Sequence, residues 1–293
     1  MKIETLVISY LDYLKSIKRY SSHTLKAYKT DLNQFLDYST SNKKINIRDL
    51  TENIIKSYLM NLSDSSITKR SISRKLSAVR GMIKYAFANS ISESNVSAYI
   101  KNPRSDRKLP GITTIDSILT IYDLADEADK NPARVKIIFE LLYGCALRVA
   151  ELCSLNIGDI DLRRKMIKVK GKGSKVRIVP VGSKSIQIVG EYQNQYSSEN
   201  RNNPLIITDR GNRIYPKYVY RIVNKYLSKV TDIKKKSPHI LRHSAATHML
   251  DAGADLRAVK EILGHENLST TQIYTHVSIE RLKSTYKKSH PKS

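Results

Sequence analysis

The chain has 293 residues, with 51 Lys and Arg against 27 Asp and Glu, so its formal net charge is +24. A hydrophobic content of 40% is ordinary for a globular protein and is enough for a sizeable core. No apolar stretch approaches the ~20 residues of a membrane helix, and charges interrupt the first apolar run. We therefore expect no signal peptide and a soluble, cytoplasmic protein.

The positive charge is spread along the chain, since residues 1–110 carry a net +11 and the remainder +13. A basic tail would concentrate the charge at one end. An excess in both halves predicts a polyanionic partner, most simply double-stranded nucleic acid. A lysine-rich composition from an AT-biased genome would give the same excess, so the charge alone leaves both explanations open.

The two cysteines, Cys145 and Cys153, lie in one apolar segment and match no metal-ligand or disulfide pattern. We interpret them as small core residues in a reducing compartment rather than as catalytic thiols.

The first 100 residues show apolar residues at helical spacing in four segments, and no strand pattern. The segments cover residues 3–17, 22–35, 52–62 and about 67–88. Ser21 or Ser22 is the expected N-cap of the second helix and Thr51 that of the third. These features predict a small helical bundle over residues 1–100.

The fourth of these helices combines an apolar stripe with a basic surface. The stripe consists of Ile72, Leu76, Val79 and Ile83. We expect Arg70, Arg74 and Lys75 to contact DNA, in the major groove or at phosphates. A solvated basic face is the alternative.

Residues 101–111, KNPRSDRKLPG, contain prolines, a glycine and charges but no apolar period, which predicts a linker. A second domain then covers residues 112–293. Its expected helices cover 114–128, 132–145, a short segment from Val149, 184–196, 215–230, 239–252, 255–263 and 278–288. Between them, KMIKVKGKGSKVRIVPV alternates apolar and polar residues around a glycine-rich break, which predicts a two-stranded hairpin. The fold class is mainly α with a small β-sheet.

The stretch SPHILRHSAATHML, residues 237–250, allows two kinds of site. His239 and His243 are four residues apart, a spacing that lets two imidazoles chelate zinc. Arg242 lies on the same turn, however, and a fixed cation repels a metal ion. Arg and His three residues apart at a helix start are better suited to an anion, so we expect no metal here.

Four stretches of the second domain carry a specific resemblance to a known family. They are YGCALRVAEL, VKGKGSKVRIVPV, PHILRHSAATHML and ILGHENLSTTQIYTHVS. Together they resemble the tyrosine site-specific recombinases of the phage integrase family, over nearly the whole chain. The first domain is similar to the family's SAM-like core-binding bundle and the second to its α+β catalytic domain. The length and the ending SIERLKSTYKKSHPKS are most similar to the Xer type.

The resemblance implies a catalytic set and no metal or other cofactor. The set consists of Arg148, Lys172, His239, Arg242, His265 and the nucleophile Tyr274. Arginine forks suit the charge that develops on a phosphate under attack, so Arg148, Arg242 and His265 would bind the scissile phosphate. A phenol with a pKa of about 10 needs a base, for which His239 is the candidate. Lys172 would protonate the leaving 5′-oxygen, as in type IB topoisomerase chemistry.

Three further residues have supporting roles in this interpretation. Glu151, one turn after Arg148, would hold a cationic side chain in position. We expect Lys175 and Arg177 to contact DNA phosphate, with a solvated strand face as the alternative. The nearby glycines and lysine do not form a nucleotide-binding loop, because G-x-x-x-x-G-K-[ST] is absent and the turn joins two strands.

The family likeness implies a DNA partner with a specific recombination site and a tetramer, either of this chain or with a second recombinase. A septal DNA translocase would be the activator, and chromosome dimer resolution at cell division the role. The alternatives are an integrase of a mobile element and a non-catalytic DNA-architectural protein. Two positions stand out. Ala146 occupies a place where the family usually has glycine, and Glu266 puts an anion near the expected phosphate site without a role that we can assign.

Overall fold

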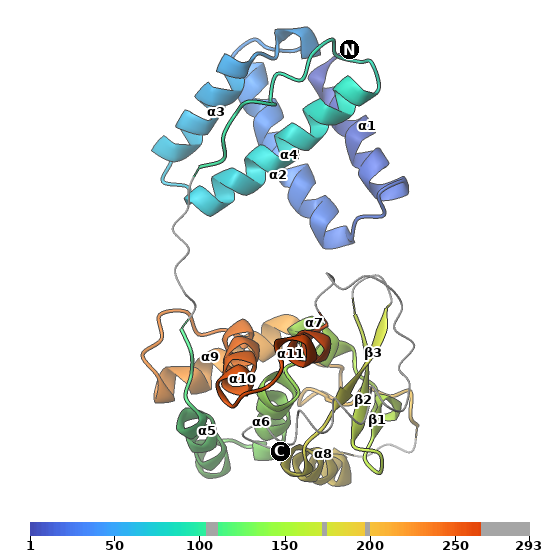
Figure 1. Cartoon of the computed structure of the whole chain (residues 1–293), viewed down its shortest axis with the longest axis vertical. Coiled ribbons are helices and arrows are strands. Elements are labelled where there is room, and N and C mark those ends of the chain that lie inside the picture. The colour runs from blue at the N-terminus through green and yellow to red at the C-terminus, as the bar shows by residue number, and fades with distance from the viewer. Residues whose placement is uncertain (104–110, 172–174, 197–199, 265–293) are drawn as a thin grey trace. The chain divides into compact units, whose positions relative to one another are not determined.

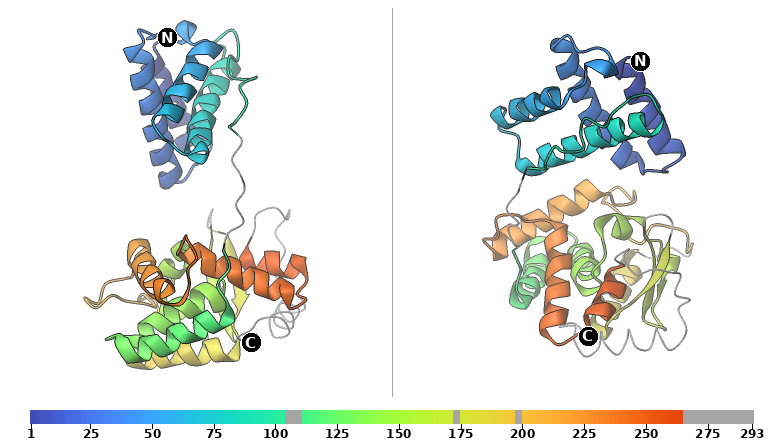
Figure 2. Two further views of the ribbon diagram at one scale, coloured as in Figure 1. Left: turned by 90° about the vertical axis from the view of Figure 1, so that its left-hand side faces the viewer. Right: turned by 45° about the horizontal axis from the view of Figure 1, so that its top comes forward.

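The computed structural model describes residues 1–103, 111–171, 175–196 and 200–264. The chain divides into two compact units, residues 1–108 and 109–293, shown in Figures 1 and 2. The division falls within the segment that we predicted as a linker.

The first unit is a helical bundle, as predicted. Its elements are α1 (Ile3–Ser16), α2 (Ser22–Ser41), the short 3-10 helix η1 (Ile47–Asp49), α3 (Glu52–Asp64) and α4 (Lys69–Ala88). The hydroxyls of Ser21, Thr51 and Thr68 cap α2, α3 and α4 by accepting a backbone N–H of the first turn. The predicted stripe of α4, Ile72, Leu76, Val79 and Ile83, is buried in the core of this unit.

A buried carboxylate joins α2 to α4. Asp31 on α2 is fully buried and accepts hydrogen bonds from Arg74 and from Lys75, whose Nζ lies 3.0 Å from Oδ1. Lys75 is itself buried and also donates to Gln34. Its ammonium therefore neutralises Asp31 instead of facing solvent, and the expectation that Lys75 contacts DNA was wrong.

We predict that Asp31→Asn lowers the free energy of unfolding of the first unit by about 3 kcal/mol, because breaking a buried ion pair leaves a cation without its partner. Urea unfolding of the full chain, followed by circular dichroism, measures this change. The exposed Glu52–Lys56 pair on α3 provides the control, since Glu52→Gln should change the same free energy by less than about 1 kcal/mol. Equal effects of the two variants would contradict the assignment.

The second unit is mostly helical and contains a small antiparallel sheet. Its helices are α5 (Ile115–Ala128), α6 (Pro132–Phe139), a π-helical turn η2 (Glu140–Gly144), α7 (Val149–Ser154), the 3-10 helix η3 (Ile157–Asp159), α8 (Ser183–Tyr196), α9 (Pro216–Val230), α10 (Pro238–Asp251) and α11 (Leu256–Leu263). The strands β1 (Ile160–Asp161), β2 (Met166–Lys170) and β3 (Val176–Pro180) pair in the order β1-β2-β3. The predicted hairpin is β2–β3, with Ile167 opposite Val179. The sequence did not predict β1, nor that the segment expected as one helix over 132–145 would change to a π turn at Glu140.

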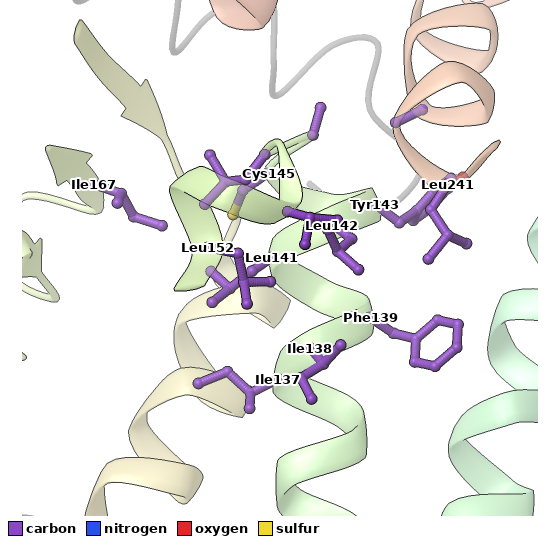
Figure 3. Packing of buried hydrophobic residues seen from close by; sticks show 14 of the residues in the cluster. Ile137, Ile138, Phe139, Leu141, Leu142, Tyr143, Cys145, Leu152, Ile167 and Leu241 are labelled. Carbon is purple, nitrogen blue, oxygen red and sulfur yellow. The ribbon is translucent and has the colours of Figure 1, made fainter. Parts of the chain in front are cut away.

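The core of this unit forms around α6, which contacts α5, α8 and α9 (Figures 1 and 2). Figure 3 shows Ile137, Ile138, Phe139, Leu141 and Leu142 packed among residues of the neighbouring segments. Both cysteines are buried, as expected for core residues. Burial raises the pKa of the Cys153 thiol to about 11.

Within the described ranges, none of the helices combines the length and the apolar character that crossing a bilayer would require.

Candidate active site

Three arginines surround one buried carboxylate in the second unit. Arg148 precedes α7, Arg177 lies on β3 and Arg242 lies on α10, while Glu151 lies on α7. The helix α11 completes the site because it contacts both α10 and β3. The chain therefore brings four separate segments to one place, and two of the three arginines, Arg148 and Arg242, belong to the predicted catalytic set.

Glu151 binds Arg148 within a single helical turn. Arg148 is the N-cap of α7, and its backbone N–H donates to Oε2 of Glu151 at 2.8 Å. Its Nη1 donates to Oε1, also at 2.8 Å. The three-residue spacing of the G-x-R-x-x-E motif, here with Ala146 in the glycine position, thus lets one carboxylate hold both the main chain and the side chain of this arginine.

Arg177 binds the same carboxylate with both arms of its fork. Nη1 and Nη2 donate to Oε1 and Oε2 of Glu151 at 2.7 and 2.9 Å. Arg177 is only 6% exposed, so the expectation that it contacts DNA phosphate was wrong. Arg242 lies further from this carboxylate, with Nη1 3.8 Å from Oε2.

The last two carbonyls of α11 and the carbonyl of its C-cap, Gly264, each accept a hydrogen bond from one of the three arginines. Arg177 Nε donates to Ile262 at 3.2 Å, Arg242 Nη2 donates to Leu263, and Arg148 Nη2 donates to Gly264 at 3.0 Å. A helix C-terminus has unsatisfied carbonyls and a partial negative charge, so it attracts all three cations. This end of α11 immediately precedes His265. This contribution could not be predicted from the sequence, because a carbonyl acceptor is not specified by residue type.

Ala146 contributes a further acceptor by adopting an unusual backbone conformation. Its φ is +50°, in the left-handed region, and its carbonyl accepts Arg242 Nη1. Alanine pays a steric cost there that glycine does not. Glycine would adopt this conformation without that cost, which gives a physical reason for a glycine two residues before the arginine, and this chain keeps the conformation with alanine.

Glu151 remains ionised over the whole physiological range. Burial alone would raise the pKa of this carboxyl, but the hydrogen bonds and charge of Arg177, followed by those of Arg148, lower it to about 2. Three guanidinium groups around one carboxylate leave a net charge of +2 at the cluster. Burial and the charge of Arg148 lower the pKa of Arg242 to about 9, which leaves it charged at neutral pH. An excess of buried positive charge favours the binding of an anion.

His239 lies in the first turn of α10, one turn before Arg242. Burial, and then the charges of Lys235, Arg242 and Arg148, lower the pKa of its imidazole below the ordinary value. The ring is therefore neutral at pH 7 and has a nitrogen that can accept a proton. Of the other histidines of α10, His248 bonds through Nδ1 to the hydroxyl of Tyr143 at 2.8 Å.

Lys172, His265 and Tyr274 of the predicted catalytic set lie outside the described residues. The glycines that precede the first two are described. A methyl group built on Gly171 would lie 3.7 Å from Nη1 of Arg177, and one built on Gly264 would lie 2.9 Å from its Cδ and Nε. The chain thus reaches the cluster immediately before both Lys172 and His265.

The remaining predicted DNA contacts lie at the surface. Arg70 and Lys175 are exposed. Arg74 pairs with Asp31 but keeps 47% of its side chain exposed. These three stay predictions.

Comparison with known proteins identifies the family. Residues 112–281 match the phage integrase family, and residues 7–90 match the phage integrase N-terminal SAM-like domain. The chain belongs to the phage integrase family. It is 37% identical to the tyrosine recombinase XerC of Thermodesulfovibrio yellowstonii, over 98% of this chain and 96% of that protein. It is 33% identical to the tyrosine recombinase XerD of Staphylococcus epidermidis strain ATCC 35984, over 99% of this chain and all of that protein. The chain is accordingly a tyrosine recombinase, an enzyme of site-specific DNA recombination.

Solved structures agree with this fold. A lambda integrase dimer bound to a COC′ core site has a TM-score of 0.73 at 18% identity, over 93% of this chain and all of that one. The XerH site-specific recombinase bound to its difH substrate has a TM-score of 0.65 at 24% identity, over 89% of this chain and 78% of that one. At these identities the likeness shows the shared fold.

We predict that Ala146→Gly raises the free energy of unfolding of the second unit by roughly 0.5–1 kcal/mol, because glycine adopts a positive φ without the steric cost. Thermal unfolding of the full chain should show the transition of this unit at a higher temperature. The control Ala246→Gly, within α10, should lower the stability by about 1 kcal/mol. A decrease for both variants would show that residue 146 does not require the left-handed conformation.

Proposed function

We propose that the chain cuts DNA at a specific site by attack of Tyr274 on a backbone phosphorus. The bond from phosphorus to the 5′-oxygen breaks as the bond to the phenolic oxygen forms, which gives a 3′-phosphotyrosyl strand and a free 5′-hydroxyl. The observation that carries the proposal is the net positive charge of the cluster that contains Arg148 and Arg242, in a chain of this family.

The proposed roles follow from what each group can donate or accept. Arg148 and Arg242, together with His265, bind the non-bridging oxygens of the scissile phosphate, where negative charge grows during attack. His239, neutral at pH 7, takes the proton of the Tyr274 hydroxyl. Lys172 gives a proton to the leaving 5′-oxygen. Glu151 holds Arg148 in place.

Rejoining reverses the same chemistry on a different strand. The 5′-hydroxyl of a partner duplex attacks the phosphotyrosine, and the phenol leaves. The energy of the broken bond is kept in the covalent intermediate, so this sequence of steps needs neither a nucleotide nor a metal-activated water. Exchange of one pair of strands gives a Holliday junction, and exchange of the second pair resolves it.

The wider role that we propose is chromosome dimer resolution at cell division, in the cytoplasm. Similarity to XerC and XerD proteins over nearly the whole length supports this role. It further suggests a tetramer around two duplexes, with two kinds of recombinase, and activation by a septal DNA translocase. Mapping the protected site in genomic DNA tests the proposal. A single locus opposite the replication origin is expected, whereas sites at the ends of a mobile element would indicate an integrase.

We expect Tyr274→Phe to abolish covalent adduct formation with a nicked suicide DNA substrate, since the variant has no phenolic oxygen to bond to phosphorus. Denaturing gel electrophoresis detects the adduct, which the wild-type chain should form. An unchanged adduct in the variant would show that another residue is the nucleophile. Binding of the cognate duplex by both proteins, without an adduct from either, would support an architectural protein.

Arg242→Ala should lower the rate of adduct formation at saturating DNA by roughly 10²–10³-fold, the effect of removing one preorganised donor from a developing anion. DNA affinity should stay within a few-fold, because many other cations support binding. Arg257→Ala is a matched control, since this arginine of α11 is 59% exposed and pairs with Glu261. Cleavage at the wild-type rate by Arg242→Ala would refute its role.

A further inference from the structure

Arg177 lies where several segments of the second unit meet. It starts on β3, bonds Glu151 on α7 through both Nη atoms, and bonds the carbonyl of Ile262 on α11 through Nε. Methyl groups built on Gly171 and Gly264 would lie 3.7 and 2.9 Å from the same side chain. Arg177 therefore bonds the carboxylate that holds Arg148, and it lies near the residues that directly precede Lys172 and His265.

The charges show what Arg177 does for the other two arginines. Glu151 has two carboxylate oxygens, and the fork of Arg177 occupies both. Arg148 shares Oε1 with Arg177, and Arg242 lies 3.8 Å from Oε2. Bidentate pairing is the strongest form of arginine–carboxylate contact, so Arg177 satisfies most of the negative charge of Glu151. Without it, the carboxylate would bind Arg148 and Arg242 more tightly and would compete with any other anion for them.

We propose that Arg177 is a positioning residue of the recombination reaction. It neutralises Glu151, so that Arg148 and Arg242 keep their positive charge for the scissile phosphate. It also ties β3, which follows Lys172 in the hairpin, to the end of α11, which precedes His265. Arg177 is buried and touches no DNA in this role. The inference rests on the proposed function, because it assumes that this cluster binds the phosphate.

Gly264 supports the same assignment from the opposite side of the contact. Its φ is +63°, and a methyl group at this position would lie 2.9 Å from Cδ and Nε of Arg177. The backbone at the end of α11 thus comes so close to Arg177 that a side chain at position 264 would require Arg177 to shift, and the positive φ also favours glycine. The contact fixes where the chain leaves α11 toward His265.

The test measures adduct formation from a nicked suicide duplex in a single turnover at saturating DNA, with DNA affinity measured separately by fluorescence anisotropy. Arg177→Met should lower the rate roughly 10–100-fold, the range expected for a group that orients catalytic residues, and should change affinity by less than about threefold. Lys168→Met removes the same charge from an exposed position of β2, and its rate should equal that of the wild type.

A second substitution separates positioning from simple packing. Adding Glu151→Gln to Arg177→Met removes the carboxylate that would compete for Arg148 and Arg242, so the double variant should react faster than Arg177→Met alone. A packing role predicts the opposite, because a second buried contact is lost. Should Arg177→Met fail to fold, Arg177→Lys keeps the charge without the fork, and its rate should still fall at least about fivefold.

The outcomes distinguish the inference from the proposed function. A rate for Arg177→Met or Arg177→Lys within twofold of wild type, or a double variant slower than Arg177→Met, overturns the inference alone. A wild-type chain that forms no adduct on its mapped site overturns the proposed function and the inference with it.

Discussion

The carboxylate of Glu151 is the interaction on which the candidate site depends. Among the described residues, Glu151 is the one anionic side chain that contacts the guanidinium groups of Arg148, Arg177 and Arg242. Arg177 and Arg242 are buried, and the side chain of Arg148 is 38% exposed. Cations placed this close repel one another, and without a counter-charge the loss of hydration of the two buried arginines would be costly. One carboxylate is enough to assemble the arginines but too little to neutralise them. The folded cluster therefore keeps a net charge of +2, which favours the binding of an anion.

Backbone carbonyls supply the rest of the attraction. The last carbonyls of α11 and the carbonyl of Ala146 accept arginine N–H groups. A carbonyl stabilises a guanidinium without cancelling its charge. Anchoring by carbonyls thus fixes the directions of the arginine side chains while preserving the net charge of +2. The strained φ of Ala146 and the glycine at position 264 are the local costs of aiming those carbonyls inward.

Much of the fold could be predicted because local signals and tertiary packing agree. Ser21 and Thr51 cap helices where the sequence places them, and the alternation around residues 166–180 forms the predicted hairpin. The strand β1 has only two residues, too few for any periodicity. The π turn after Phe139 continues the apolar pattern of α6, so the sequence does not show where the α-helix ends and the π turn begins.

The errors at the site have the same physical origin. We expected Arg177 to contact DNA because of its charge. Residues two apart in a strand point to the same face, however, and Arg177 lies on the buried face of β3 together with Val179. Asp31 likewise lies in the apolar stripe of α2, three residues after Tyr28 and four before Phe35. Lys75 is buried because its ammonium bonds this buried carboxylate. A charged residue at a core position in the periodic pattern indicates a buried ion pair, and its partner cannot be found from local sequence.

The arrangement also explains why four separate motifs are needed for one chemical step. Arg148, Arg177 and Arg242 come from segments far apart in sequence, and each arginine is held by groups from at least one other segment. Within the part of the chain that the structure describes, only the turn that contains Arg148 and Glu151 supplies both an arginine of the cluster and an acceptor that holds it. Arg177 and Arg242 bond acceptors from other segments. The site can therefore exist only in the folded second unit, and a shift of α11 would move all three arginines together. Such coupling suits the reaction that we propose, in which the phosphate meets its donors, the base and the nucleophile at the same time, because it would set the geometry of the arginines before DNA arrives.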